Sequence, residues 1–188
     1  MKIFLCRHGN RHENGFDAEN PVRLTPGGWK QAAKLADWLA PQDIQFVFSS
    51  PKIRAIETAI PTAIRTTGRI NVWPLLIEHD SYGPLDWNES AIYRTGADFI
   101  RGMCLDDAPK TEDFGFAYQR ACAVLSKIRE LYRSDRVAIF AHDCFNSVFI
   151  WAWLNRGALA EADRYYQDEC CVNILEDGKD PQINLRVF

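Results

Sequence analysis

The chain has 188 residues, a length that fits one domain and is short for two. Hydrophobic residues make up 47% and charged residues 25%, which is typical of a globular protein and excludes a disordered, collagen-like or coiled-coil chain. The formal net charge of −3 provides no overall attraction to nucleic acid or to an anionic membrane. We therefore expect a single domain over residues 1–188, with no nucleic-acid partner and no membrane partner.

Targeting and cysteine patterns indicate the cytoplasm. No apolar run approaches the roughly 18 residues of a membrane span, and the N-terminal run reaches Arg7 after four apolar residues, which is too short for a secretory signal. The six cysteines include no C-x-x-C pair, so reduced and mostly buried thiols are expected rather than disulfides or zinc ligands. We predict a cytoplasmic protein, either a monomer or a homodimer.

The first part of the chain alternates short apolar runs, typical of buried strands, with amphipathic helical patterns. In chain order the sequence predicts a strand, a helix, a strand, a helix and a strand over residues 2–6, 25–39, 45–48, 50–64 and 71–77. Thr25-Pro26 and Ser50-Pro51 each place a capping residue before a proline that suits the first helical position, and we interpret both as structural caps. Pro61 is expected to kink or shorten the second helix.

The second part of the chain opens with an irregular stretch over residues 81–112. Its glycine, proline and aromatic residues interrupt the alternation, so we predict a lid or specificity insert there. A helix, a strand, a helix and a hairpin-like pair of strands follow over residues 112–132, 136–141, 142–155, 171–175 and 183–188. The inward face of the first of these helices is predicted to carry Ala121, Val124, Leu125, Ile128 and Leu131. The alternation predicts a three-layer α/β/α fold with a mostly parallel central sheet.

Charged and titratable residues gather at the predicted carboxyl ends of the strands, where a parallel sheet binds its ligands. In strand order they are Arg7 and His8; Arg54, one turn into a helix; Glu78, His79 and Asp80; and His142 and Asp143. Guanidinium groups match phosphate oxygens, and a neutral histidine between them can accept a phosphoryl group covalently. A protonated second histidine would neutralise phosphate charge, and a carboxylic acid would protonate the departing oxygen. This inventory predicts phosphoryl transfer through phosphohistidine.

Five segments, in order and spacing over residues 1–150, resemble the histidine phosphatase superfamily, the phosphoglycerate mutase-like proteins. The segments are residues 5–9 with the Arg-His-Gly motif, 24–28 with 31–32, 49–51 with 54 and 57–59, 76–78, and 137–142. The resemblance implies the phosphoglycerate mutase-like fold and a metal-independent phosphoric monoester hydrolase without a cofactor. It also implies a small phosphorylated substrate. A phosphate or sulfate ion would fit into the site that binds this substrate.

The resemblance assigns roles to single residues of this sequence. His8 would be the nucleophile, and Glu78 would be the proton donor. The implied phosphate-binding residues are Arg7, Asn14, Arg54 and His142. Arg11 stands where smaller members usually carry Ser or Thr, and the pattern Arg-His-Gly-x-Arg is similar to the acid phosphatase and phytase branch, which makes Arg11 a further candidate for phosphate binding.

A second departure from the family pattern leaves the proton donor open. Asp143 follows His142 where the mutase-like branch usually has Gly, and the acid phosphatase branch uses an Asp there as the donor. Asp143 could instead cap the helix that follows. The imperfect register near Glu78 also leaves His79 or Asp80 as the residue that points inward. We favour Glu78, because the short chain and its remaining motifs match the mutase-like branch.

Other phosphate chemistries lack their motifs in this chain. There is no Cys-x5-Arg, no Gly-Lys-Ser/Thr phosphate loop and no Gly-x-Gly-x-x-Gly. The carboxylates and histidines near the site could mimic a metal centre, but the flanking Arg7 and Arg54 would repel a cation, so we expect no metal. A phosphomutase that uses His8 and a non-catalytic phospho-ligand binder remain as alternatives. Arg23 and Lys52 could receive a second anionic group or be surface charges.

Overall fold

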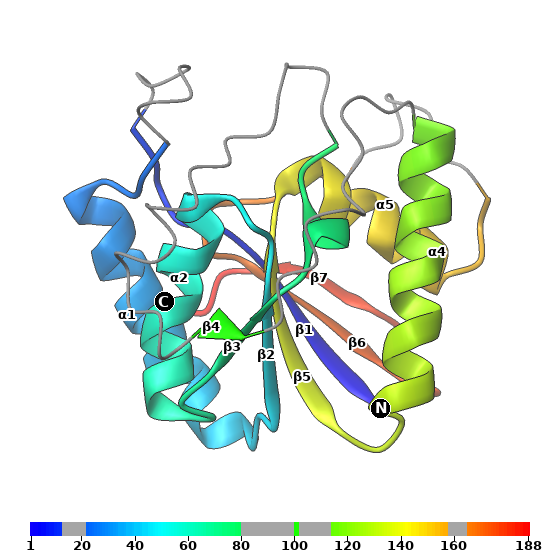
Figure 1. The fold of residues 1–188 in the computed structure, drawn as a ribbon, viewed down its shortest axis with the longest axis horizontal. Helices are drawn as coiled ribbons and strands as arrows, with labels where there is room; N and C mark the ends of the chain where they lie inside the picture. Colours follow the sequence, from blue (N-terminus) through cyan, green and yellow to red (C-terminus); the bar gives the residue numbers. More distant parts are fainter. Residues whose placement is uncertain (13–21, 80–99, 102–113, 158–164) are drawn as a thin grey trace.

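The computed structural model describes residues 1–12, 22–79, 100–101, 114–157 and 165–188. The described strands form one seven-stranded sheet in the order β4-β3-β2-β5-β1-β6-β7 (Figure 1). The strands are β1 (Lys2–Arg7), β2 (Phe46–Ser49), β3 (Ile70–Val72), β4 (Ile100–Arg101), β5 (Arg136–Ala141), β6 (Val172–Glu176) and β7 (Gln182–Leu185). The five strands from β4 to β1 are parallel, whereas β6 is antiparallel to both β1 and β7. The predicted mostly parallel sheet is confirmed.

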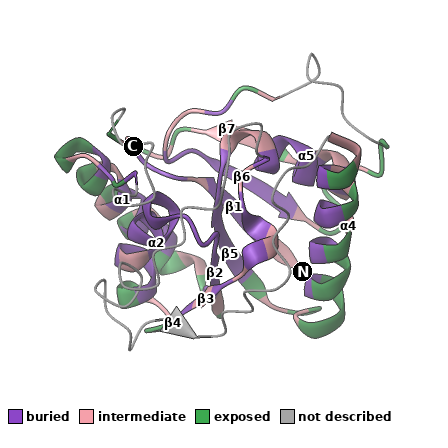
Figure 2. Ribbon diagram, turned by 45° about the horizontal axis from the view of Figure 1, so that its top comes forward, coloured by how far each residue is buried: buried purple, intermediate pink, exposed green. Residues whose placement is uncertain are grey.

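Helices cover both faces of this sheet. On one face α1 (Pro26–Leu39) packs beside α2 (Ile53–Arg65), and on the other α4 (Phe114–Leu131) packs beside α5 (Asp143–Trp153). Along β1, Ile3 and Leu5 join the α4–α5 core, whereas Phe4 and Cys6 join the α1–α2 core. This alternation is expected of a strand buried on both faces. Figure 2 shows buried strands between helices whose outer surfaces are exposed, which is the predicted three-layer architecture.

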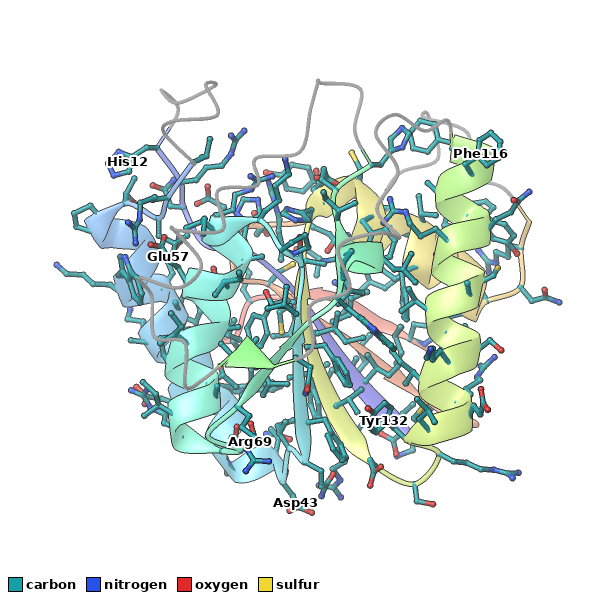
Figure 3. All side chains as sticks on the ribbon, in the orientation of Figure 1. His12, Asp43, Glu57, Arg69, Phe116 and Tyr132 are labelled. Atoms are coloured by element: carbon teal, nitrogen blue, oxygen red, sulfur yellow. The ribbon has the colours of Figure 1, made fainter. Side chains whose placement is uncertain are left out.

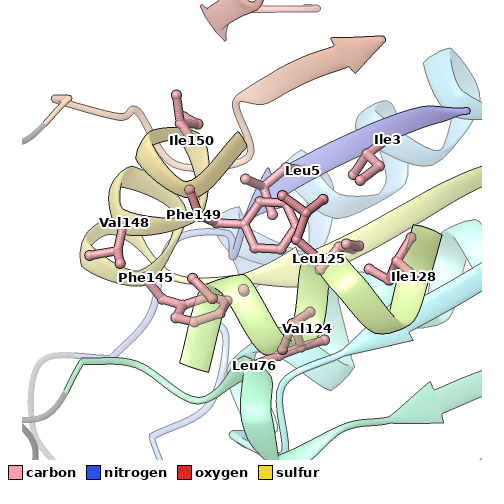
Figure 4. Close-up of a cluster of buried hydrophobic side chains, with 14 of the residues drawn as sticks. Ile3, Leu5, Leu76, Val124, Leu125, Ile128, Phe145, Val148, Phe149 and Ile150 are labelled. Carbon is pink, nitrogen blue, oxygen red and sulfur yellow. The ribbon is translucent and has the colours of Figure 1, made fainter. Parts of the chain in front are cut away.

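The core between the sheet and α4–α5 holds α5 in place just after the end of β5. Phe145 and Phe149 of α5 pack in one cluster with Val124 and Leu125 of α4 and with Leu5 of β1 (Figure 4). The prediction that Leu131 faces this core was wrong, since its side chain is 54% exposed. Helical spacing continues from Ile128 to Tyr132, whose ring packs 4.5 Å from that of Phe46.

The helix start at Thr25-Pro26 is confirmed, and the one at Ser50-Pro51 was wrong. The Thr25 hydroxyl accepts the Gly28 N–H at 3.0 Å, and Pro26 is the first residue of α1. By contrast, α2 begins at Ile53 with Lys52 as its N-cap residue. The Ser50 N–H donates to the Phe140 carbonyl at 2.9 Å, so hydrogen bonding to β5 continues one residue past the end of β2.

The third predicted strand was too long, and Pro61 does not shorten α2. Strand β3 ends at Val72, and a 3-10 turn, η2 (Pro74–Leu76), follows it because proline cannot donate to a strand ladder. Glu78 therefore follows this turn rather than the end of a strand. Helix α2 continues through Pro61 to Arg65. A second 3-10 turn, η1 (Ala40–Gln42), links α1 to β2.

The last predicted features are the C-terminal hairpin, the insert and the state of the cysteines. The hairpin of β6 and β7 is confirmed, with Gly178 in the left-handed region at φ 76°. Of the predicted insert, only Ile100–Arg101 lies within the described residues. Among the cysteines described, all are free thiols, with Cys6, Cys170 and Cys171 buried. The described helices include none long and apolar enough to cross a bilayer.

Candidate active site

Those predicted site residues that the structure describes lie at the end of the sheet where β1, β2 and β5 finish. Figure 3 marks this end by His12 and Glu57 and the opposite end by Asp43 and Arg69. The rings of His8 and His142, which follow the neighbouring strands β1 and β5, lie 5.3 Å apart. The parallel pairing of these strands explains how residues 134 positions apart in the sequence come into contact.

The His8 ring is held in one orientation by its own loop. Its side chain is 4% exposed, and its Nδ1 lies 2.8 Å from the Gly9 carbonyl oxygen. Because a carbonyl only accepts, Nδ1 must carry the hydrogen, which leaves a lone pair on Nε2. Burial lowers the pKa of His8 well below its ordinary value, and the charge of Arg54 lowers it further. The neutral ring with a free Nε2 is the form that can act as a nucleophile.

His142 is fully buried and is hydrogen-bonded through Nε2, whereas His8 is hydrogen-bonded through Nδ1. Its Nε2 lies 2.7 Å from the Ser50 hydroxyl oxygen. Its Nδ1 is buried and has no hydrogen-bond partner among the described residues. Burial lowers the pKa of His142 well below its ordinary value, with the charges of Arg54, His8 and Lys52 acting in the same direction. Ser50, predicted as a cap, therefore belongs to the site.

Arg54 and Arg11 add positive charge beside the two histidines. Arg54 lies in the first turn of α2 and is 9% exposed. Burial is the largest cause of the lowered pKa of both imidazoles, and the charge of Arg54 is the second largest. Helix α2 is tied to the His8 loop by Thr58, whose hydroxyl accepts the Gly9 N–H at 3.0 Å and donates to the Arg54 carbonyl at 2.7 Å. Arg11 also lowers the pKa of His8. These charges favour an anionic ligand over a cation.

The Arg7 guanidinium is anchored by a residue that sequence reasoning missed. Its Nη1 donates to the backbone carbonyl of Gln167. The Gln167 amide is fully buried; its oxygen accepts from Asn146 and Asn173 at 3.1 and 2.9 Å. Its nitrogen donates to the Asp143 carbonyl at 3.2 Å. A glutamine in an unassigned stretch of sequence carries no signal for this role.

Glu78 lies at the N-terminus of α5. Its Oε1 accepts the backbone N–H groups of Phe145 and His79, both at 3.0 Å. Burial raises the pKa of this carboxyl group, although these hydrogen bonds and the Arg54 charge oppose the shift. The segment is held by Arg120, whose Nη1 donates to the carbonyls of Leu75 and Ile77 at 2.6 and 2.8 Å. Sequence reasoning missed Arg120, a buried cation with its pKa lowered by burial to about 10.

The structure bears on the other candidates for the proton donor. Asp143 is the first residue of α5 and lies close enough to raise the pKa of Glu78; the N-cap residue of this helix is His142 rather than Asp143. His79 packs its ring 4.2 Å from that of Phe114 on α4. Asp80 and the phosphate-binding candidate Asn14 lie outside the described residues.

The two residues considered for a second anionic group differ in their surroundings. Arg23 pairs with the buried Glu57 at 2.6 Å. Glu57 also accepts the Leu24 N–H at 2.8 Å, so the pair fastens the chain before α1 to α2. Lys52 is only 8% exposed, so it is not an ordinary surface charge. No cluster of three or more His, Cys, Asp or Glu side chains that could hold a metal ion exists within the described ranges.

Comparison with known proteins agrees with this arrangement. Residues 3–186 match the Histidine phosphatase superfamily (branch 1). Rv0525, an uncharacterized protein of Mycobacterium tuberculosis, is 33% identical over an alignment of 103 residues, and the match covers 49% of this chain and 51% of that protein. The chain thus spans about half the length of the curated relatives that it matches.

Solved structures show the same fold over nearly the whole chain. A putative alpha-ribazole-5'-P phosphatase from Escherichia coli K-12 MG1655 superposes with a TM-score of 0.70 and 23% identity, covering 97% of this chain and 94% of that one. The mycobacterial glucosyl-3-phosphoglycerate phosphatase Rv2419c, in complex with VO3, has a TM-score of 0.69 and 18% identity, covering 93% and 92%. These likenesses establish the fold.

Proposed function

The chain belongs to the histidine phosphatase superfamily, and from this membership we propose that it is a metal-independent phosphomonoester hydrolase acting through a covalent phosphohistidine on His8. The orientation of His8 carries the proposal. Its Nδ1–H is held by the Gly9 carbonyl, which leaves the lone pair of Nε2 available for attack on phosphorus. Arg7, Arg54 and Arg11 supply the charge that a phosphate dianion requires.

The proposed reaction has two steps. In the first, His8 Nε2 attacks phosphorus, the bond from phosphorus to the ester oxygen breaks, and a carboxylic acid protonates the departing oxygen. In the second, water attacks the phosphohistidine, the same carboxylate takes a proton from it, and the phosphorus–nitrogen bond breaks to release phosphate. Arg7, Asn14, Arg54 and His142 would bind the phosphate oxygens throughout.

We assign the acid to Glu78 rather than to Asp143. Burial raises the pKa of Glu78, which favours the protonated form that a donor needs. The two backbone N–H groups that bond this carboxyl group both donate to Oε1, which leaves Oε2 to carry the proton. Asp143 would instead act electrostatically, by disfavouring a second negative charge beside it.

The substrate class rests on the site and on the relatives. Two proteins of the same fold support a small phosphorylated substrate. One is a glucosyl-3-phosphoglycerate phosphatase, and the other is a putative alpha-ribazole-5'-P phosphatase. We include in the proposal a single domain, a cytoplasmic location, a monomeric or homodimeric state, and an insert at residues 81–112 that selects the substrate. The proposal includes no nucleic-acid partner, no membrane partner and no cofactor.

Turnover of p-nitrophenyl phosphate tests the hydrolase. The His8→Ala variant should lose more than about a thousandfold in turnover, as expected when a nucleophile is removed. Acid-sensitive phosphate label on the quenched wild-type protein, absent from His8→Ala, would identify the intermediate. Activity that depends on a bisphosphorylated activator would indicate the mutase, and phosphate binding without any turnover would indicate the binder.

Two carboxylate variants test the donor. An alkyl phosphate needs acid assistance, whereas p-nitrophenolate leaves almost without it. Glu78→Gln should therefore reduce turnover of the alkyl ester far more than that of the aryl ester. Asp143→Asn should affect both esters alike. If Asp143→Asn shows the selective loss instead, the assignment passes to Asp143.

A further inference from the structure

The environment of Ser50 is unusual for a serine that precedes a proline. Ser50 is fully buried, and its backbone N–H is used by the Phe140 carbonyl. Its hydroxyl oxygen lies 3.3 Å from the Lys52 backbone nitrogen and 2.7 Å from His142 Nε2. Since the Lys52 N–H can only donate, it occupies one lone pair of the hydroxyl oxygen. One lone pair and one hydrogen remain for the bond to His142.

The direction of the bond between Ser50 and His142 follows from counting hydrogens. If His142 Nε2–H donates to the hydroxyl, the Ser50 hydrogen has no acceptor among the described residues, and His142 Nδ1 is also left unused. If Ser50 donates to Nε2, the hydroxyl is fully satisfied and only His142 Nδ1–H is left without a partner. Buried polar groups without partners are costly, so the second arrangement is favoured.

We infer that Ser50 is a positioning residue, which holds His142 as the neutral Nδ1–H tautomer so that this N–H donates to a phosphate oxygen. The two nitrogens of an imidazole point in diverging directions, so an Nε2 bonded to Ser50 leaves Nδ1 directed away from it. The His142 ring lies 5.3 Å from the ring of His8, so the ring is beside the proposed nucleophile, and Nδ1 is the ring nitrogen that has no protein partner among the described residues. The inference rests on the proposed phosphate site.

The charges around His142 make its tautomer important. Burial and the nearby Arg54 and Lys52 lower the pKa of the ring, so it stays neutral near pH 7 rather than protonated as the sequence led us to expect. A neutral ring has one N–H, and a ring with that hydrogen on Nε2 would present a lone pair to the phosphate. The wrong tautomer therefore replaces an attraction with a repulsion.

The tautomer can be read directly from the ring nitrogens by 15N NMR. The chain has four histidines, and a His142→Gln spectrum assigns the signals of His142 by their loss. At pH 7.5 we expect the hydrogen on Nδ1 in the wild type and a shift toward Nε2–H in Ser50→Ala. Ser49→Ala is the matched control, because Ser49 is equally buried and its hydroxyl donates to the Ser50 carbonyl instead. Wild-type His142 with the hydrogen on Nε2 would overturn the inference.

Phosphate binding provides a second readout that does not require turnover. Titration with inorganic phosphate at pH 8 should give an affinity about 10- to 100-fold weaker for Ser50→Ala, as expected for the loss of one hydrogen bond to a charged group. Ser50→Thr keeps the hydroxyl and should bind like the wild type.

The outcomes separate this inference from the proposed function. A loss of phosphate affinity in Ser50→Ala that Ser50→Thr does not restore would contradict the positioning role and leave Ser50 a packing residue. The expected tautomer together with full turnover in His8→Ala would instead overturn the phosphohistidine mechanism alone. If Ser50→Ala does not fold, the wild-type spectrum and Ser50→Thr still decide the matter.

Discussion

The close contact between α1 and the His8 loop can be tested at two adjacent glycines. A Cβ atom added at Gly28 would lie 2.1 Å from the Asn10 backbone carbonyl oxygen, a distance that real Cβ atoms do not show. A Cβ added at Gly27 would have only the Thr25 hydroxyl as a neighbour, at 3.5 Å, which is an ordinary contact. Gly28→Ala and Gly27→Ala therefore make the same chemical change one residue apart, and only the first creates a clash.

The expected effects have opposite signs. To accommodate Gly28→Ala, the Asn10 carbonyl must move from 2.1 Å to at least 3.0 Å from the new methyl group. Overpacking against backbone typically costs about 1–3 kcal/mol, and we expect the upper part of that range. Gly27→Ala should be neutral or stabilise by up to about 1 kcal/mol, because alanine loses less conformational freedom in a helix.

Activity should follow the same pattern, because Asn10 lies two residues after His8. A displacement near 1 Å in a reacting group can cost about a hundredfold in rate, so we expect kcat/KM of Gly28→Ala to fall by that order while Gly27→Ala stays near the wild type. Urea denaturation and p-nitrophenyl phosphate turnover measure the two effects. Equal stability and equal activity in both variants would refute this account of the packing.

Three further predictions concern buried polar groups. Glu57→Ala should lower the free energy of unfolding by about 2–3 kcal/mol, since it removes one partner of a pair that is buried on one side; an unchanged urea midpoint would contradict this. Gln167→Leu should also lower the free energy of unfolding by about 2–3 kcal/mol, because it removes the hydrogen bonds that hold this residue in place. It should weaken phosphate binding as well, since the Gln167 backbone carbonyl that bonds Arg7 is then less well fixed. An unchanged phosphate affinity in a calorimetric titration would contradict this. Burial lowers the pKa of His8 and of His142, so both bind protons more weakly in the folded protein than in the unfolded chain. Tm should therefore fall as pH drops below about 6.5, and it should fall less steeply in His142→Asn. A Tm that stays constant from pH 7.5 to 5.5 would count against the buried neutral state of these two rings.

Local patterns were sufficient where the physics is local. The Thr25 cap, the proline after it and the left-handed turn at Gly178 each depend on a few neighbouring residues, and all were predictable. The strands β1 and β5 were predictable because a strand buried on both faces must be continuously apolar. Since parallel strands end at one edge of the sheet, the meeting of His8 and His142 could also be anticipated.

Local patterns failed where the same residues serve distant partners. Ser50-Pro51 is nearly the same signal as Thr25-Pro26, yet the Ser50 backbone bonds Phe140 of β5 and its side chain bonds His142, 92 residues away. Nothing near Gln167 in the sequence marks it as the anchor of Arg7, 160 residues away. A capping motif indicates only which hydrogen bonds a side chain is able to form. Which of these bonds the side chain forms depends on the groups that the fold places beside it.

The amino-acid sequence is enough to predict which chemical groups this protein carries and at which end of the sheet they lie. The folded arrangement is needed to tell which imidazole nitrogen of His8 carries the hydrogen and which serine hydroxyl lies beside His142. It is also needed to tell which carboxyl group is buried enough to favour its protonated form. The physical reason is that desolvation and hydrogen-bond partnership are set by everything packed around a group, and most of those neighbours are remote along the chain.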